Sequence, residues 1–178
     1  MDWNELLQPD LILEGSILHL TPDVLQQYQI KGLILDVDET LVPIKATAAS
    51  YELQQWVANT REVAEMWLVS NNLSDARIGS IARSLNLPYI CGAVKPSRRK
   101  LRQALAAMNL PVAQVAMVGD RFFTDVLAGN RLGMFTILVE PFVTPGEVVR
   151  SSPIRNFEVL LSQAMGVSLS AKNKYLDK

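Results

Sequence analysis

Short apolar runs alternate with longer amphipathic segments along the chain, and this alternation predicts an α/β fold. We expect five strands, at residues 32–35, 66–69, 88–91, 115–118 and 135–139. Because these runs are continuously apolar, they are typical of strands that helices cover on both faces. The pattern therefore predicts a three-layer α/β/α arrangement around a central, mostly parallel sheet.

The segments between the expected strands carry helical signals. Leu101, Leu105 and Met108 are spaced to form one apolar helix face. The helix expected within residues 124–132 ends at Gly133, because glycine readily adopts the left-handed conformation that ends many helices. Further helices are expected within residues 22–29, 51–62, 75–85 and 156–165. We interpret residues 1–178 as one domain, with 1–30 as an extension packed on the core and 168–178 as a flexible tail.

Composition narrows the possible chemistry. The 178 residues include one cysteine, Cys91, and one histidine, His19, which argues against disulfides, zinc clusters and histidine-based triads. With 17 basic and 18 acidic residues the net charge is −1, so no global field favours nucleic-acid binding, and no specific nucleic-acid binding is expected. Catalysis would therefore rest on carboxylates, hydroxyls and lysine.

The first 30 residues carry five acidic side chains and no Lys or Arg. A secretory signal begins with basic residues and a transit peptide is rich in arginine, so neither fits. The longest charge-free run, residues 103–119, is broken by Asn109-Leu110-Pro111 and falls short of the roughly 20 apolar residues of a spanning helix. We expect a cytoplasmic protein, with at most a peripheral contact on the inner face of a membrane.

Polar side chains directly follow three of the expected strands. Asp36, Ser70 and Asp120 each stand at the carboxyl end of an apolar run. Ligand sites of parallel α/β sheets lie at these ends, and core packing does not require polar residues there. We therefore interpret the three residues as parts of one site.

Asp36 and Asp38 form the sharpest local feature. Residues two apart on a strand project to the same side, so both carboxyl groups can flank one small group. Such a pair suits acid–base chemistry when one carboxylate attacks and the other, protonated, donates to the leaving group. Taken alone, the pair fits a loop or a helix cap equally well.

An ordered set of motifs is more specific than this pair. It contains Asp36-Val37-Asp38-Glu39-Thr40, Ser70-Asn71, Lys95-Pro96, Gly119-Asp120 and Asp125. Each part fits phosphoryl transfer, in which positioning and charge stabilisation dominate. A carboxylate nucleophile divides the hydrolysis into formation and breakdown of an aspartyl phosphate, while Mg²⁺ and a lysine offset negative charge. Separately, Ser70-Asn71 fits a helix cap, Lys95 a solvated surface residue and Asp125 a favourable charge at a helix start.

This set resembles the motifs of the haloacid dehalogenase (HAD) superfamily of phosphatases. The resemblance implies a HAD-like Rossmannoid fold, with Asp36 as nucleophile and Mg²⁺ ligand and Asp120 as a further ligand. It implies that Asp38 is the general acid/base and also binds Mg²⁺ through its backbone carbonyl. The remaining implied roles are phosphoryl binding by Ser70 and Asn71, charge balance by Lys95, and support by Thr40, Gly119 and Asp125.

The resemblance extends over about residues 9–142. Within it, Phe122-Phe123-Thr124-Asp125 and the following Gly129-Asn130 are similar to the YqeG-like, subclass IIIA branch of HAD phosphatases. Members of that branch include phosphatidylglycerophosphate phosphatases, which make phosphatidylglycerol in phospholipid biosynthesis. The resemblance therefore implies a Mg²⁺-dependent phosphomonoester hydrolase with this phospholipid as its substrate.

Glu39 departs from that branch, which usually has asparagine at this position. The Asp-x-Asp-Glu-Thr form is shared with phosphoprotein phosphatases of the same superfamily, so a phosphoprotein, nucleic-acid or other phosphate ester is an alternative substrate. A non-enzymatic, phosphorylatable binding module such as a receiver domain is a further alternative. Receivers carry the phosphorylated aspartate on a middle strand, whereas here the Asp-x-Asp pair follows the first long strand.

The spacing of the motifs leaves no room for a large cap domain. Thr40 and Ser70 are 30 positions apart, and Lys95 and Asp120 are 25 apart, enough for a helix, loops and a strand. An uncapped site is open and excludes water poorly, so it suits a phosphate on a bulky carrier such as a lipid.

Five cations lie close together in the sequence, at Lys95, Arg98, Arg99, Lys100 and Arg102. Cations are disfavoured near a helix start, so we interpret them as a rim for a phospholipid head group at an anionic bilayer. A merely solvated charged face is the alternative. The apolar residues among positions 3–13 are expected to pack on the sheet edge, and insertion at a membrane is the alternative. The oligomeric state stays open.

Overall fold

The computed structural model describes residues 3–142, 153–164 and 166–167. Its sheet has the strand order β1-β6-β5-β2-β3-β4, and every neighbouring pair is parallel. The strands span Leu11–Ile12 (β1), Gly32–Leu35 (β2), Glu65–Val69 (β3), Tyr89–Ile90 (β4), Val115–Gly119 (β5) and Phe135–Leu138 (β6). The predicted α/β fold with a parallel sheet is confirmed, and β1 is an edge strand that the apolar pattern did not predict.

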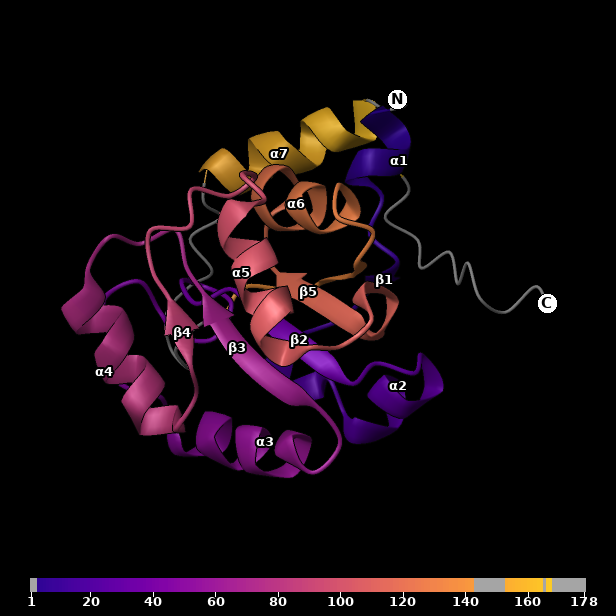
Figure 1. Ribbon diagram of the computed structural model, residues 1–178. Coiled ribbons are helices and arrows are strands. Elements are labelled where there is room, and N and C mark those ends of the chain that lie inside the picture. The colour runs from indigo at the N-terminus through magenta and orange to yellow at the C-terminus, as the bar shows by residue number, and fades with distance from the viewer. Residues whose placement is uncertain (1–2, 143–152, 165, 168–178) are drawn as a thin grey trace.

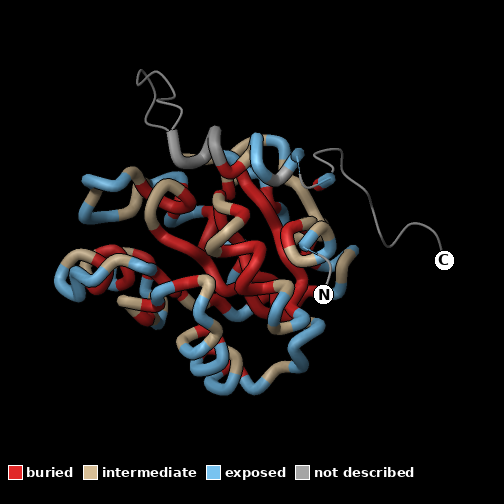
Figure 2. The backbone as a smooth tube through the Cα atoms, turned by 90° about the horizontal axis from the view of Figure 1, so that it is seen from above, coloured by how far each residue is buried: buried red, intermediate tan, exposed pale blue. Residues whose placement is uncertain are grey.

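Helices cover both faces of the sheet (Figure 1). Side chains of β2 alternate between the faces: Leu33 and Leu35 belong to one apolar cluster and Ile34 to the other. The first cluster includes residues of α2 (Pro22–Gln27), α3 (Tyr51–Arg61) and α4 (Asp75–Leu85), and the second includes residues of α5 (Arg99–Met108) and α6 (Leu127–Asn130). The buried strands accordingly run through the centre of the molecule in Figure 2.

The amino-terminal segment packs against the edge of the sheet. After α1 (Trp3–Leu7), strand β1 pairs with β6, and Leu7 is fully buried. The Asp10 carboxylate accepts hydrogen bonds from the backbone nitrogen and the hydroxyl of Thr136, at 2.9 and 3.0 Å. Leu7, Leu11 and Ile12 thus contact the rest of the fold, whereas Trp3 is 54% exposed.

The helix expected within residues 124–132 begins earlier than predicted. A π-helical segment, Phe122–Val126, precedes α6. The last helix, α7, spans Pro153–Ala164, and the tail expected at 168–178 lies outside the described residues. No helix in the described part of the chain is both long and apolar enough to cross a membrane.

The connections between the central strands hold no additional folded unit. Between β2 and β3 the chain forms a loop and α3, and between β4 and β5 it forms a loop, α5 and a short 3-10 helix, Val112–Gln114. Both connections lie wholly within the described residues. The expected absence of a large cap therefore agrees with the fold.

Candidate active site

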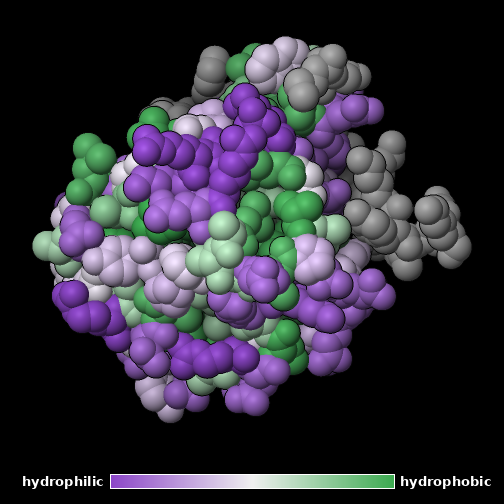
Figure 3. Space-filling view, in the orientation of Figure 1, coloured by the Kyte–Doolittle hydropathy of each residue, from purple (hydrophilic) through white to green (hydrophobic). Residues whose placement is uncertain are grey.

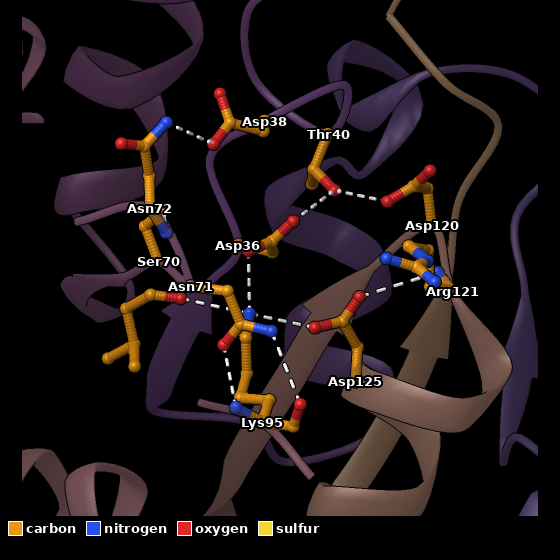
Figure 4. A network of polar contacts seen from close by, with 11 residues as sticks. Asp36, Asp38, Thr40, Ser70, Asn71, Asn72, Lys95, Asp120, Arg121 and Asp125 are labelled. Atoms are coloured by element: carbon orange, nitrogen blue, oxygen red, sulfur yellow. Dashed lines mark hydrogen bonds and ion pairs between the residues drawn. The ribbon is translucent and has the colours of Figure 1, made fainter. Parts of the chain in front are cut away.

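The polar residues that follow the central strands meet at one edge of the sheet (Figure 4). Leu35, the last residue of β2, pairs with Leu68 of β3 and with Val118 of β5. Asp36 and the polar residues after β3 and β5 therefore leave the sheet side by side. Since β3 lies on one side of β2 and β5 on the other, this edge is a topological switch point, where α/β sheets bind ligands.

Lys95 lies at the centre of the group, although its loop follows the outer strand β4. Its ammonium nitrogen is 2.6 Å from an oxygen of Asp36 and 2.8 Å from an oxygen of Asp125. It also donates to the backbone oxygen of Val69 at 2.9 Å. With 4% of its surface exposed, Lys95 is a buried cation rather than a solvated surface residue.

Asp125 reaches the group from the π-helical segment after β5. Its second carboxylate oxygen accepts a hydrogen bond from the backbone nitrogen of Arg121, at 3.3 Å. This carboxylate packs directly on the backbone of Gly119, so that a Cβ atom at Gly119 would collide with it. Glycine at this position thus permits the approach of Asp125 to Lys95.

The Thr40 hydroxyl lies between two carboxylates. Its oxygen is 3.4 Å from an oxygen of Asp36 and 3.2 Å from an oxygen of Asp120, and all three residues are buried. A hydroxyl carries one hydrogen, so it can donate fully to only one of them at a time. Thr40 therefore links the loop after β2 to the end of β5.

Burial and the neighbouring charges shift the pKa values of the central pair. The pKa of Asp36 is raised to about 6, because burial, the largest cause, and the neighbouring Asp125 raise it more than Lys95 lowers it. For Lys95, burial acts to lower the pKa, but Asp125 and Asp36 outweigh it and raise the pKa to about 12. Lys95 is therefore held as a cation beside a carboxyl group whose ionisation is costly.

The acidic residues of the group could hold a metal ion. Asp36, Asp120 and Asp125 are buried, and each offers an oxygen within 4.8 Å of the others. Three carboxylates against the single ammonium of Lys95 leave an excess of negative charge in a buried space. Oxygen ligands with excess negative charge suit a hard divalent cation, so the residues present fit such an ion.

The side chain of Asp38 lies apart from this carboxylate group. Its two oxygens accept hydrogen bonds from Arg77, at 2.6 Å, and from the side-chain amide of Asn72, at 3.2 Å. Arg77 also donates to the backbone oxygens of Ala46 and Pro43. A metal-ligand role for Asp38 would thus fall to its backbone carbonyl, as the resemblance implies, while Asp125 supplies the third nearby carboxylate.

Arg77 and Asn72 are the site residues that sequence reasoning did not identify. Arg77 stands in the first turn of α4, where a cation is unfavourable for the helix dipole. Arg98–Lys100 also place cations at a helix start, and this was the reason to interpret them as functional. The same criterion identifies Arg77 in α4. For Asn72 the sequence offers no signal beyond its position after Ser70-Asn71.

The two residues predicted to bind phosphate organise the loops around Lys95. The side-chain amide of Asn71 brackets the backbone of Lys95, accepting from its nitrogen at 2.6 Å and donating to its oxygen at 3.2 Å. The hydroxyl oxygen of Ser70 accepts from the backbone nitrogen of Asn72 at 3.0 Å. Both residues therefore lie next to the charged group, and phosphoryl binding by them stays a prediction.

The chain is similar in sequence to known proteins. A family described as HAD-hydrolase-like matches residues 92–162. The probable phosphatase YqeG of Bacillus subtilis is 36% identical over 127 residues, which cover 71% of this chain and 73% of that protein. The chloroplastic phosphatidylglycerophosphate phosphatase 1 of Chlamydomonas reinhardtii is 31% identical over 176 residues, which cover 92% of this chain and 65% of that protein.

The fold is also shared with a solved structure. The cobalt-bound deoxy-D-mannose-octulosonate 8-phosphate phosphatase of Haemophilus influenzae matches with a TM-score of 0.50 at 13% identity, over 86% of this chain and 96% of that one. A likeness at this identity concerns the fold alone, and it confirms the predicted HAD-like arrangement. The identity to the Bacillus protein shows that the chain belongs to the YqeG-like family of HAD-type phosphatases.

Proposed function

We propose that this HAD phosphatase is Mg²⁺-dependent and converts phosphatidylglycerophosphate to phosphatidylglycerol through an aspartyl phosphate. The observation that carries the chemistry is the buried ammonium of Lys95 between Asp36 and Asp125, beside Asp120. The identity to the algal protein named for this lipid supports the substrate. The connections after β2 and β4 hold no additional folded unit that could cap the site, and this also favours a phosphate on a large carrier.

In the first step, a carboxylate oxygen of Asp36 attacks the phosphorus atom. The bond from phosphorus to the ester oxygen breaks, and the Asp38 carboxyl group gives its proton to the leaving alcohol. Lys95 offsets the negative charge of the transferring group, and Ser70 and Asn71 bind its oxygens. A donor that is already held in place, as Lys95 is, needs no rearrangement during the reaction and therefore stabilises the transition state effectively.

In the second step, a water molecule attacks the phosphorus atom of the aspartyl phosphate. The Asp38 carboxylate accepts a proton from this water, and the bond from phosphorus to Asp36 breaks. Inorganic phosphate leaves, and Asp36 regains its carboxylate. Across both steps Asp38 first donates and then accepts one proton, so the residue returns to its starting state.

Asp36, Asp120 and the backbone carbonyl of Asp38 are the proposed ligands of Mg²⁺, with Asp125 and Thr40 as support. When bound, Mg²⁺ supplies the positive charge that offsets repulsion between the attacking carboxylate and the phosphate. The excess of negative charge among the three buried carboxylates supports this assignment. We place the reaction at the cytoplasmic face of a membrane, where the substrate's head group would be accessible.

The test measures Mg²⁺-dependent phosphate release by the full chain from phosphatidylglycerophosphate in detergent micelles. Parallel samples contain a phosphopeptide, a nucleotide and a sugar phosphate, and Asp36→Asn is the control. We expect turnover of the lipid above the other esters and a loss of at least about 10³-fold in Asp36→Asn. Faster turnover of the phosphopeptide would overturn the substrate but keep the chemistry, whereas full activity of Asp36→Asn would overturn the nucleophile.

A further inference from the structure

Three strongly exposed hydrophobic side chains lie on the loops that carry the site residues. Ile44, Leu73 and Val94 are exposed by 57%, 82% and 66% of their surface. Each lies on a loop that leaves the carboxyl end of a strand, after β2, β3 and β4 respectively. These are the same loops that carry Asp38, Asn71 and Lys95. We call Ile44, Leu73 and Val94 the apolar rim.

Hydrogen bonds hold these three loops together. The Arg77 side chain, in the first turn of α4, donates to the backbone oxygens of Pro43 and Ala46, on either side of Ile44. The backbone nitrogen of Gly92 donates to the oxygen of Asn72 at 2.8 Å, and Asn71 binds the backbone of Lys95, next to Val94. The apolar rim is therefore fixed relative to the site and does not consist of unrelated surface residues.

Folding alone does not account for Val94. Its φ angle is +55°, in the left-handed region that β-branched residues avoid. Strained residues cluster at functional sites, and Val94 directly precedes Lys95 while its side chain remains exposed. Leu73 likewise extends into solvent directly beside the polar residues Ser70–Asn72. Apolar side chains in such positions are typical of a surface that meets another apolar phase.

Basic side chains flank the apolar rim. Lys45, next to Ile44, is exposed, and so are Arg99 and Arg102 of α5, whose first turn contains no acidic residue. Figure 3 shows a strongly hydrophilic patch over α5 and hydrophobic side chains projecting from the neighbouring edge, above α4. Exposed apolar residues beside exposed cations are complementary to an anionic bilayer, whose head groups are negative and whose interior is apolar.

We propose that the apolar rim and these cations dock the site on an anionic phospholipid bilayer. Ile44, Leu73 and Val94 enter the boundary between head groups and acyl chains, and Lys45, Arg99 and Arg102 face lipid phosphates. The edge of the sheet that carries Asp36 then faces the membrane, so a lipid phosphate reaches Asp36 without leaving the bilayer. The orientation rests on the proposed lipid substrate, whereas the binding surface can be tested separately.

The test is co-sedimentation of the full chain, carrying Asp36→Asn to prevent turnover, with vesicles of phosphatidylglycerol and phosphatidylcholine. A triple variant, Ile44→Ser, Leu73→Ser and Val94→Asn, removes the apolar rim, and asparagine tolerates the left-handed backbone at residue 94. We expect at least about tenfold weaker vesicle binding by the triple variant. Val112→Ser, an exposed apolar position before the amino end of β5, is the matched control and should bind like the parent.

A second measurement separates docking from catalysis. Without the Asp36 substitution, the triple variant should hydrolyse soluble p-nitrophenyl phosphate within about twofold of the unaltered chain, while its turnover of vesicle-bound lipid phosphate falls about tenfold.

Parallel loss of activity on both substrates would overturn the docking role. So would equal vesicle binding by the triple variant and its parent. If the parent bound no vesicles, the docking role would also be overturned, and a protein would be the remaining candidate to contact the apolar rim. Rim-dependent binding without lipid hydrolysis would support the docking surface and overturn the proposed substrate.

Discussion

The guanidinium of Arg77 lies 2.6 Å from a carboxylate oxygen of Asp38, across 39 positions of sequence. Arg77 also donates to the backbone of the loop that follows Asp38. The ion pair is partly exposed, so its contribution to stability is small. Its main effect is positional, because it sets the direction of the carboxyl group that we propose as the general acid/base.

Replacing Arg77 should therefore affect substrates unequally. In Arg77→Gln, Asp38 loses its ion-pair partner and keeps only the hydrogen bond from Asn72. Turnover of an alkyl phosphate should then fall about 10- to 100-fold, since general-acid help contributes roughly 10²–10⁴-fold. p-Nitrophenyl phosphate has a good leaving group that needs little protonation, so its turnover should fall less than about threefold. The measurement is kcat on both substrates, with Arg83→Gln, an exposed position on the same helix, as control. Equal losses on both substrates would argue against a positioning role.

Lys95→Met should destabilise the protein most strongly when no metal is bound. The change leaves Asp36 and Asp125 as buried carboxylates without their shared cation, and breaking a buried pair typically costs about 3–5 kcal/mol. Urea unfolding at pH 8 measures the loss, and added Mg²⁺ should restore part of it. Lys31→Met, at an exposed lysine, serves as the control. A stability equal to that of the unaltered chain would contradict the pairing.

The raised pKa of Asp36 predicts how stability depends on pH in the absence of metal. Because burial raises this pKa from 3.8 to about 6, the folded chain binds a proton more tightly than the unfolded chain. The resulting stabilisation is present below about pH 4 and is lost as the pH rises through 6, on the order of 3 kcal/mol in total. Urea unfolding between pH 4 and 7 should show this decline in the unaltered chain relative to Asp36→Asn. If the stabilities of the unaltered chain and of Asp36→Asn changed in parallel with pH, the prediction of a raised Asp36 pKa would be wrong.

Gly119→Ala should disturb the site through Asp125. The added Cβ atom would collide with the Asp125 carboxyl group, which packs on the glycine backbone and holds Lys95. We expect a loss of about 1–3 kcal/mol in stability, as for other overpacked positions, together with at least tenfold lower activity, roughly the effect of a misplaced supporting group. Gly133→Asn is the control, because residue 133 has open space and a φ of +73° that asparagine tolerates. If Gly119→Ala kept full activity, the reaction would not depend on the position of Asp125.

The strands and the strand-end residues were readable from the sequence for a simple physical reason. A strand covered on both faces needs a continuous apolar run, so residues 32–35 match β2 as observed. Asp36, Ser70 and Asp120 interrupt such runs abruptly, and parallel strands bring their carboxyl ends to one edge. The edge strand β1 was missed because two residues are too few for a recognisable pattern.

The sequence by itself thus determined the order of the motifs and the edge of the sheet at which they meet. Only the tertiary structure decided which side chains touch. It placed Lys95 between Asp36 and Asp125, turned the side chain of Asp38 toward Arg77, and left Ile44, Leu73 and Val94 exposed on the loops that carry the site. Such contacts join residues far apart in the chain, and their charge interactions depend on distance and burial, neither of which local sequence encodes.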